Sequence, residues 1–188
     1  MGHSRSFPHS AIPRRLFRHI LECSLSACQR YRYRLQVALS PAWDSLPTLT
    51  IILKNPSTAD AQRGDPTTGK VETWARHHGF AAVTYLNLFA LRSPYPKALN
   101  SVDYDEALGA ANDQTIQDEL RHTQKLVIAW GNPNGIEAVR YQRRTTEVTR
   151  LLHASQKTTY TVGSHTLLGY PRHGLQWRKE MGIMRLGD

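Results

Sequence analysis

Cysteines and long apolar runs are scarce in this sequence of 188 residues, and each scarcity excludes a class of protein. Cys23 and Cys28 are too few for a disulfide framework or for a zinc site built on cysteine pairs. No apolar run approaches the roughly 18 residues that a membrane-spanning helix needs. Residues 1–18 are basic and lack the continuous apolar stretch of a secretory signal. We therefore expect a cytoplasmic protein with reduced thiols and no contact with a membrane.

Three sequence signatures of common enzymes are also missing. The chain has no Gly-x-x-x-x-Gly-Lys-Ser/Thr and no Gly-x-Gly-x-x-Gly, which argues against binding of a nucleoside triphosphate or a dinucleotide. It has no Gly-x-Ser-x-Gly nucleophile elbow. His77 and His78 are adjacent, and neighbouring residues on a helix point in different directions, so this pair does not indicate a metal site. We expect neither a metal ion nor an organic cofactor.

Positive charge is present in excess. Lysine and arginine together number 24 against 15 aspartates and glutamates, which gives a formal net charge of +9. Most of these cations are arginines, whose planar guanidinium suits phosphate. This balance is typical of proteins that bind a polyanion, most often nucleic acid, and it fits equally well a basic protein with solvated faces. The arginines gather in three places: Arg14, Arg15 and Arg18; Arg30, Arg32 and Arg34; and Arg140, Arg143, Arg144 and Arg150.

Short apolar segments predict the strands of the domain. Residues 31–39 alternate apolar and polar side chains with a period of two, which is typical of a strand with one face in water. Compact aliphatic runs predict further strands at 49–53, 82–86, 125–130 and 158–162. Helical patterns between them cover about 71–78, 103–122 and 135–154, with Asn134 as the N-cap of the last helix.

Strands that alternate with helices indicate an α/β fold. We expect a single three-layer domain with a mostly parallel central sheet and helices on both of its faces. Residues 1–29 are interpreted as a basic N-terminal extension, and residues 30–188 as the domain. No repeat or interdomain linker divides the chain.

Three polar segments follow expected strands, where ligands of an open α/β sheet bind. An asparagine amide can hold a water or read the edge of a base. A histidine can donate a hydrogen bond to an oxygen on which negative charge develops. An aromatic ring can stack on a base, and an arginine can hold a phosphate. The segments are Asn55–Asp60, Asn87–Arg92 and Pro171–Leu175.

The same residues have purely structural interpretations. Ser57 fits a helix cap, and Asp60 fits the first turn of a helix. Asn87 can satisfy the backbone at a strand end, and Phe89 fits the hydrophobic core. The arginines within 140–150 fit a solvated helix face.

Four segments of the chain together resemble a bacterial and phage family known as domain of unknown function 1643. They are Leu53–Asp60, Asn87–Arg92, Asn112-Asp113 and Ala129–Gly131. The resemblance runs from about Tyr31 to Leu175. The name of that family carries no activity, so this resemblance implies kinship more than function.

A more distant resemblance connects the strand-end residues to the uracil-DNA glycosylase superfamily and implies its fold. Asn55 would match the water-positioning asparagine of the mismatch-specific branch, with Pro56 and Ser57 beside the substrate. Asn87 would match the residue that reads the pyrimidine, and Phe89 would stack on the base.

The last loop extends this resemblance. His173 would match the residue that stabilises the departing base, although Gly174 follows it where the superfamily usually has proline. Leu175 would be the wedge that fills the gap in the base stack. Contacts with DNA would come from Arg92, Arg172, Arg140, Arg143 and Arg144.

The resemblance implies a monofunctional DNA glycosylase, and we expect the protein to be a monomer. The enzyme would flip one nucleotide out of DNA, at a cost of a few kcal/mol in lost stacking. Asn55 would align the attacking water, and Asp60 is the alternative general base. A modified pyrimidine in phage DNA as the target would give the enzyme a role in antiviral defence. Two alternatives stay open, a hydrolase or transferase of free modified nucleotides and a DNA-binding module without catalysis.

Overall fold

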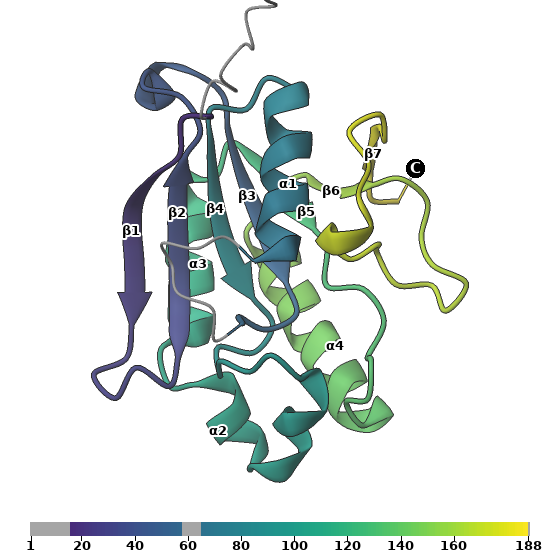
Figure 1. Cartoon of the computed structure of the whole chain (residues 1–188). Helices are drawn as coiled ribbons and strands as arrows, with labels where there is room; N and C mark the ends of the chain where they lie inside the picture. Colours follow the sequence, from purple (N-terminus) through teal and green to yellow (C-terminus); the bar gives the residue numbers. More distant parts are fainter. Residues whose placement is uncertain (1–15, 58–64, 188) are drawn as a thin grey trace, which may run out of the picture.

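A seven-stranded β-sheet forms the centre of the protein in a computed structural model that describes residues 16–57 and 65–187. The strands lie in the order β1-β2-β4-β3-β5-β6-β7, which runs from left to right in Figure 1. Their bounds are β1 (His19–Leu25), β2 (Arg32–Ala38), β3 (Thr48–Leu53), β4 (Ala82–Asn87), β5 (Lys125–Ile128), β6 (Thr159–Val162) and β7 (Ile183–Arg185).

Helices cover both faces of the sheet. Helix α1 (Pro66–His77) packs on one face, and α3 (Asn112–His122) and α4 (Ala138–Ala154) pack on the other (Figure 1). A short helix, α2 (Tyr104–Leu108), precedes α3, and three 3-10 turns complete the fold: η1 (Trp43–Ser45), η2 (Pro96–Ser101) and η3 (Gly174–Gln176). Within the described residues, no helix has the length and apolar character needed to cross a membrane.

The sheet is mixed, so the prediction of a mostly parallel sheet is wrong, whereas the α/β class is confirmed. The central strands β4, β3, β5 and β6 pair in parallel, as strands connected through helices do. Strand β1 pairs antiparallel with β2, β2 with β4, and β7 with β6. Residues 26–31 join β1 to β2, and a connection this short can only join antiparallel strands.

Strand β1 lies within the segment that the sequence analysis treats as an N-terminal extension. His19 pairs with Ala38, and Cys23 pairs with Leu35. The sheet therefore begins before residue 30. The strand sequence, HILECSL, does not alternate regularly between apolar and polar residues, and the strand is only partly buried. Its sequence pattern therefore does not predict a strand.

The polar side chains of β2 are more covered than the prediction of one wet face implies. Arg32 is 5% exposed, and Arg34 forms an ion pair with Glu119 of α3 at 2.9 Å. Arg34 and Gln36 stay partly exposed, so this face of β2 is partly covered and not fully solvated.

Two helix predictions also change. The helix expected over 103–122 is interrupted by Gly109, which has a φ of +79°. Gly109 also packs closely on Tyr31, because a Cβ added to Gly109 would lie 2.8 Å from Tyr31 Cδ1. Helix α4 begins after the expected start, with Glu137 at its N-cap. Asn134 therefore does not cap it and instead adopts a φ of +53° in a turn.

The parallel pairing of β3 with β4 brings the ends of these strands together. The backbone N–H of Leu88 donates to Leu53 O at 2.9 Å, and that of Phe89 donates to Lys54 O at 3.0 Å. The loops that follow the two strands consequently leave the same edge of the sheet, the edge at which α/β proteins bind ligands.

Candidate functional site

A polar cavity of about 230 Å³ lies at the carboxyl edge of the sheet. The end of β3, the loop after β4, the start of α1 and the loop leading into η3 contribute to its lining. Asn55 and Ser57 come from the first predicted segment, and His173 and Leu175 come from the third. The tertiary structure thus joins two of the three predicted segments in one cavity.

Asn55 is held by two hydrogen bonds from its side-chain amide. Its Nδ2 donates to Pro56 O at 3.2 Å and to Ser93 O at 2.9 Å. The N–H of Ser93 donates in turn to Pro56 O at 2.9 Å, which ties the loops after β3 and β4 together. Because Nδ2 makes both bonds, Oδ1 is left as an acceptor for a water or a polar group in the cavity.

Ser57 bonds to a carboxylate. Its Oγ donates to Asp65 Oδ2 at 2.7 Å, and Asp65 Oδ1 accepts from the N–H of Thr68 at 2.8 Å. Asp65 is the N-cap of α1, and Pro66 follows it. The sequence analysis missed Asp65 as a site residue, although Asp before Pro at the start of a helix is a recognisable signal.

His173 is a neutral hydrogen-bond donor. Its Nδ1 accepts from the N–H of Leu175 at 3.3 Å, so the proton of the neutral ring sits on Nε2. Burial, reinforced by the positive charge of Lys54, lowers the pKa of His173 to about 4. The imidazole therefore stays uncharged at physiological pH and can donate from Nε2.

Two glycines allow the close packing around His173. A Cβ on Gly131, which has a φ of +67°, would lie 2.7 Å from His173 Cβ. A Cβ on Gly174 would lie 2.7 Å from Val71 Cγ2 of α1. Proline carries a Cβ, so the proline that the glycosylase superfamily has after its histidine does not fit this packing.

Lys54 is a buried cation that the sequence analysis did not assign to the site. It is 2% exposed and lines the cavity. Its Nζ lies 5.8 Å from the ring centroid of Tyr141, and this ammonium makes no hydrogen bond or ion pair within the described part of the chain. Burial lowers the pKa of Lys54 to about 8. A lysine directly after an aliphatic strand is the signal that could have identified it.

Arg32 is a second buried cation on the same cavity. It is 5% exposed, and its Nε has no hydrogen-bond partner among the described residues. Burial lowers the pKa of Arg32, and the negative charge of Asp65 opposes this effect. Arg32 forms no ion pair with any described carboxylate. It was predicted only as one of a cluster of arginines on a wet strand.

The second predicted segment does not reach the cavity. Asn87 is 1% exposed, and both polar atoms of its side chain lack a partner within the described residues. Phe89 is fully buried and packs edge-on against Tyr104, so it is not available to stack on a base. Pro56 is buried next to the cavity without lining it.

Arg144 is a structural residue in this fold. It is fully buried, and its Nε donates to Leu88 O at 2.6 Å. Its guanidinium also forms ion pairs with Asp113 at 2.5 Å and with Glu147 at 3.5 Å. A side chain without exposed surface cannot contact DNA, so the prediction that Arg144 binds DNA is wrong.

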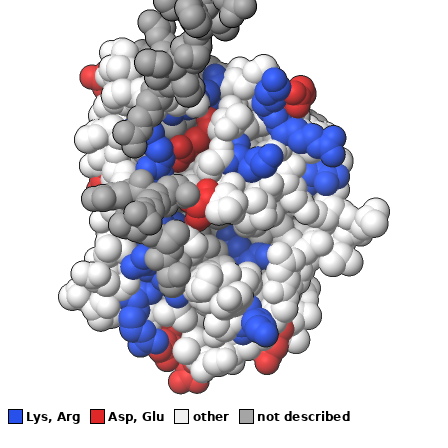
Figure 2. Space-filling view, in the orientation of Figure 1, with Lys and Arg blue, Asp and Glu red and all other residues white. Residues whose placement is uncertain are grey.

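The remaining predicted arginines reach the surface and are engaged in local contacts. Figure 2 shows basic side chains over the visible face with acidic ones between them, so the positive charge on that face is interrupted. The contacts are those of Arg92 with Gln29 O at 3.0 Å, Arg140 with Leu99 O at 2.7 Å, Arg143 with Glu147 at 2.9 Å and Arg172 with Ser164 Oγ at 3.2 Å.

Two further predictions concern the general base Asp60 and the absence of a metal site. Asp60, the alternative general base, lies outside the described residues. Within residues 16–57 and 65–187, no group of three or more His, Cys, Asp or Glu side chains could hold a metal ion. Asp65 is thus the carboxylate that the described residues bring to the cavity.

Fold and cavity together define an α/β protein with a candidate ligand site at the carboxyl edge of its sheet. Residues 32–175 match a family described as protein of unknown function (DUF1643). The match covers more than half of the chain, so the protein belongs to this family, as its motifs predict. No curated protein and no solved structure matches the chain. The likeness to uracil-DNA glycosylases therefore stays a prediction.

Proposed function

We propose that the protein hydrolyses the N-glycosidic bond of a nucleotide flipped out of DNA. The observation that carries this proposal is the convergence of Asn55 and His173 on one polar cavity. Hydrolysis of this bond needs a group that aligns water and a group that stabilises the departing base. These two residues can supply both functions from different loops.

Asn55 and Asp65 would act on the water. The free acceptor of Asn55, Oδ1, can hold a water molecule below C1′ of the sugar, because its Nδ2 is already fixed to two carbonyl groups. An amide is too weak a base to remove a proton. The Asp65 carboxylate lines the same cavity and can accept that proton as the water attacks.

His173 would act on the base. As the N-glycosidic bond stretches, negative charge grows on the pyrimidine, and a hydrogen bond from Nε2 stabilises it. A neutral imidazole is suited to this task, because its charge does not have to be desolvated in the closed site. With a pKa of about 4, His173 stays neutral throughout the physiological range.

DNA contact would come from exposed side chains at the cavity and elsewhere on the surface. Leu175 lines the cavity and is 46% exposed, so it can enter the base stack as a wedge. Arg172 and Arg143 reach the surface and can meet phosphates. The net charge of +9 favours association with a polyanion.

The test is formation of abasic sites. Wild type is incubated with single- and double-stranded DNA that carries uracil, unmodified bases, or the modified pyrimidines of phage DNA, and the products are broken with alkali. We expect breaks in one of these substrates. Asn55→Ala and His173→Gln should each lower the rate of base removal by about 100-fold or more, as loss of one preorganised polar group does.

Lys70→Met is the matched control, because Lys70 is exposed on α1. It should keep the full rate. If wild type binds DNA and releases no base from any substrate, the glycosylase proposal is wrong. Base release from free nucleotides alone would identify a nucleotide hydrolase, and salt-sensitive DNA binding without any product would identify a binding module.

A further inference from the structure

We propose that Arg32 and Lys54 form a binding site for an oxyanion, a phosphate or a carboxylate group, inside the cavity at the carboxyl edge of the sheet. The two cations come from β2 and from the end of β3 and line the same cavity of about 230 Å³. The inference goes beyond base removal, because holding an anion requires no hydrolysis.

Both cations are buried without the partners that burial requires. Lys54 is 98% covered, and its ammonium forms no hydrogen bond or ion pair within the described part of the chain. Arg32 is 95% covered, and its Nε has no partner there. A charge taken out of water is strongly unfavourable unless it is paired and hydrogen-bonded. A ligand that enters the cavity can supply that pairing.

Arg144 shows how this fold treats a buried cation with a structural role. Its guanidinium bonds to Leu88 O and to the carboxylates of Asp113 and Glu147. Arg32 and Lys54 have no such set among the described residues, although they are buried to a similar degree. The difference points to a role that needs their charges unpaired until a ligand arrives.

The other groups on the cavity leave its charge positive. Asp65 is its described carboxylate, and the oxygens of Asp65 already accept from Ser57 and Thr68. His173 is neutral, as its pKa of about 4 requires. The first turn of α1 adds the partial positive charge of a helix N-terminus.

The two side chains are complementary in the way they bind oxyanions. A guanidinium can form two parallel hydrogen bonds to one phosphate or carboxylate, and an ammonium acts as a compact point charge beside it. The anion could be a phosphate of a nucleotide or nucleic acid, or an acidic substituent of the base. The same two residues serve either source.

Binding is measured by calorimetric titration of the full-length protein. The probes are inorganic phosphate, deoxyuridine monophosphate against deoxyuridine, and pyrimidine carboxylate against uracil. We expect at least one anionic probe to bind. A preference of about tenfold or more for the nucleotide over the nucleoside identifies a phosphate as the ligand, and the same preference for the carboxylated pyrimidine identifies an acidic base.

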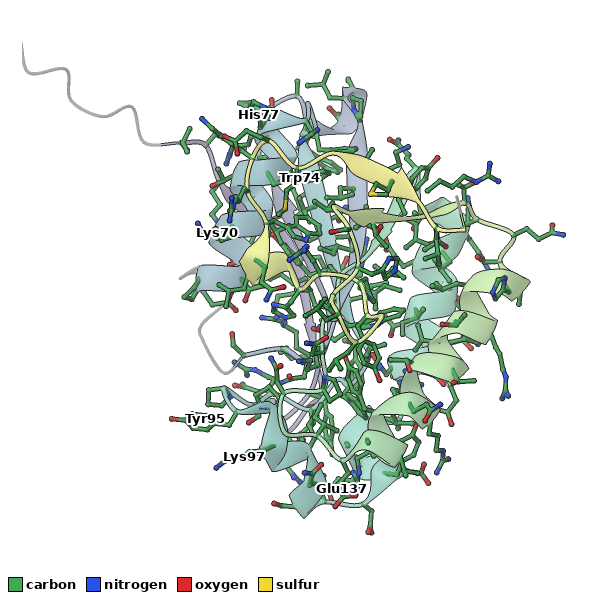
Figure 3. All side chains as sticks on the ribbon, turned by 90° about the vertical axis from the view of Figure 1, so that its right-hand side faces the viewer. Lys70, Trp74, His77, Tyr95, Lys97 and Glu137 are labelled. Atoms are coloured by element: carbon green, nitrogen blue, oxygen red, sulfur yellow. The ribbon has the colours of Figure 1, made fainter. Side chains whose placement is uncertain are left out.

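Arg32→Gln and Lys54→Met should each weaken anion binding by about tenfold or more. Both variants remove a buried charge, so they are expected to fold, which thermal unfolding checks. The control is Lys70→Met, which removes an exposed charge from α1 (Figure 3) and should bind as wild type does.

A pH series with sulfate separates the charge of Lys54 from a structural effect. The charge of sulfate is constant between pH 6 and pH 10, so a change in binding reports on the protein. The other titratable groups that line the cavity with Lys54 are His173, Asp65 and Arg32, and the Tyr141 ring lies 5.8 Å from its Nζ. His173 is neutral, and burial raises the pKa of Tyr141. Sulfate binding should weaken as the pH rises through about 8, and Lys54→Met should remove this dependence.

The outcomes separate this inference from the proposed function. If no anionic probe binds, or if both variants bind as wild type does, the anion site is wrong even if base removal is observed. If an anion binds through Arg32 and Lys54 and no base is released, the anion site holds and the glycosylase proposal fails.

Discussion

Lys54 and Arg144 differ in how their buried charges are satisfied. Arg144 meets two carboxylates and a backbone carbonyl, whereas the Lys54 ammonium has no hydrogen bond or ion pair among the described residues and lies 5.8 Å from the centroid of the Tyr141 ring. The charge of Lys54 therefore lowers the stability of the free protein, and that of Arg144 is required for it. We therefore expect substitutions of these two residues to change the free energy of unfolding in opposite directions.

Lys54→Met should stabilise the free protein near pH 7. Burial lowers the pKa of Lys54 from 10.5 to about 8, so below pH 8 folding carries the cost of a buried charge, on the order of 3 kcal/mol. Between pH 8 and 10.5 the unfolded chain binds more protons than the folded one, and the stability of wild type rises with pH. Urea unfolding should show the advantage of the variant shrinking over this range, and a constant advantage would contradict the prediction.

Arg144→Met should lower the free energy of unfolding by about 3 kcal/mol, because it removes a buried guanidinium that donates to Leu88 O and pairs with Asp113 and Glu147. The adjacent Arg143 is exposed, and Arg143→Met should change stability by less than about 1 kcal/mol. Chemical denaturation of the pair measures both values. Equal losses would mean that burial does not distinguish these neighbours.

At the scale of elements, the site depends on where loops touch. The loop after β5 contains Gly131, which lies directly against His173 in the loop before η3. The loops after β3 and β4 are joined through Asn55 and Ser93. Each candidate group is thus placed by a contact between two loops, and changes at these contacts should move it.

Gly131→Ala should displace His173. The new Cβ would sit 2.7 Å from His173 Cβ at a φ of +67°, so the loop must shift, at a cost of about 1–3 kcal/mol. A shifted ring gains access to water, and its pKa should rise from about 4 towards the ordinary value of 6.5, which a proton NMR titration measures. Gly169→Ala is the control, since it has a φ of +79° and no atom within 4 Å of its Cβ. It should leave that pKa unchanged.

At the scale of the whole molecule, the sheet is completed by strands from both ends of the described chain. Strand β1 protects the edge of β2, and β7 protects that of β6. An exposed strand edge offers unpaired backbone groups to other chains. The N-terminal segment is therefore part of the folded unit from His19 onward.

Deletion of residues 1–29 should destabilise the protein and promote aggregation, because it removes β1 and uncovers β2. Size-exclusion chromatography and circular dichroism compare the shortened chain with wild type. Deletion of residues 1–15 keeps β1 and serves as the control. A stable monomer that begins at residue 30 would show that β1 is dispensable.

The sequence alone identifies several features because their signals are local. The aliphatic run before Asn55 and the helical pattern before Gly79 predict β3 and the end of α1, and their alternation indicates the α/β class. The family follows from short motifs in the same way. The loop with Asn55 was predicted as a site because strand ends bind ligands in such folds, and it does line a cavity.

Only the tertiary structure decides which polar residues meet and which are buried. Arg32, Lys54 and His173 belong to separate elements, and no local pattern shows that they share one cavity. Phe89 and Arg144 are of residue types that often contact nucleic acid. Both are buried here, because helices packed on the sheet cover them. Periodicity reports which side chains share a face of an element, and the arrangement of elements in space determines what covers that face.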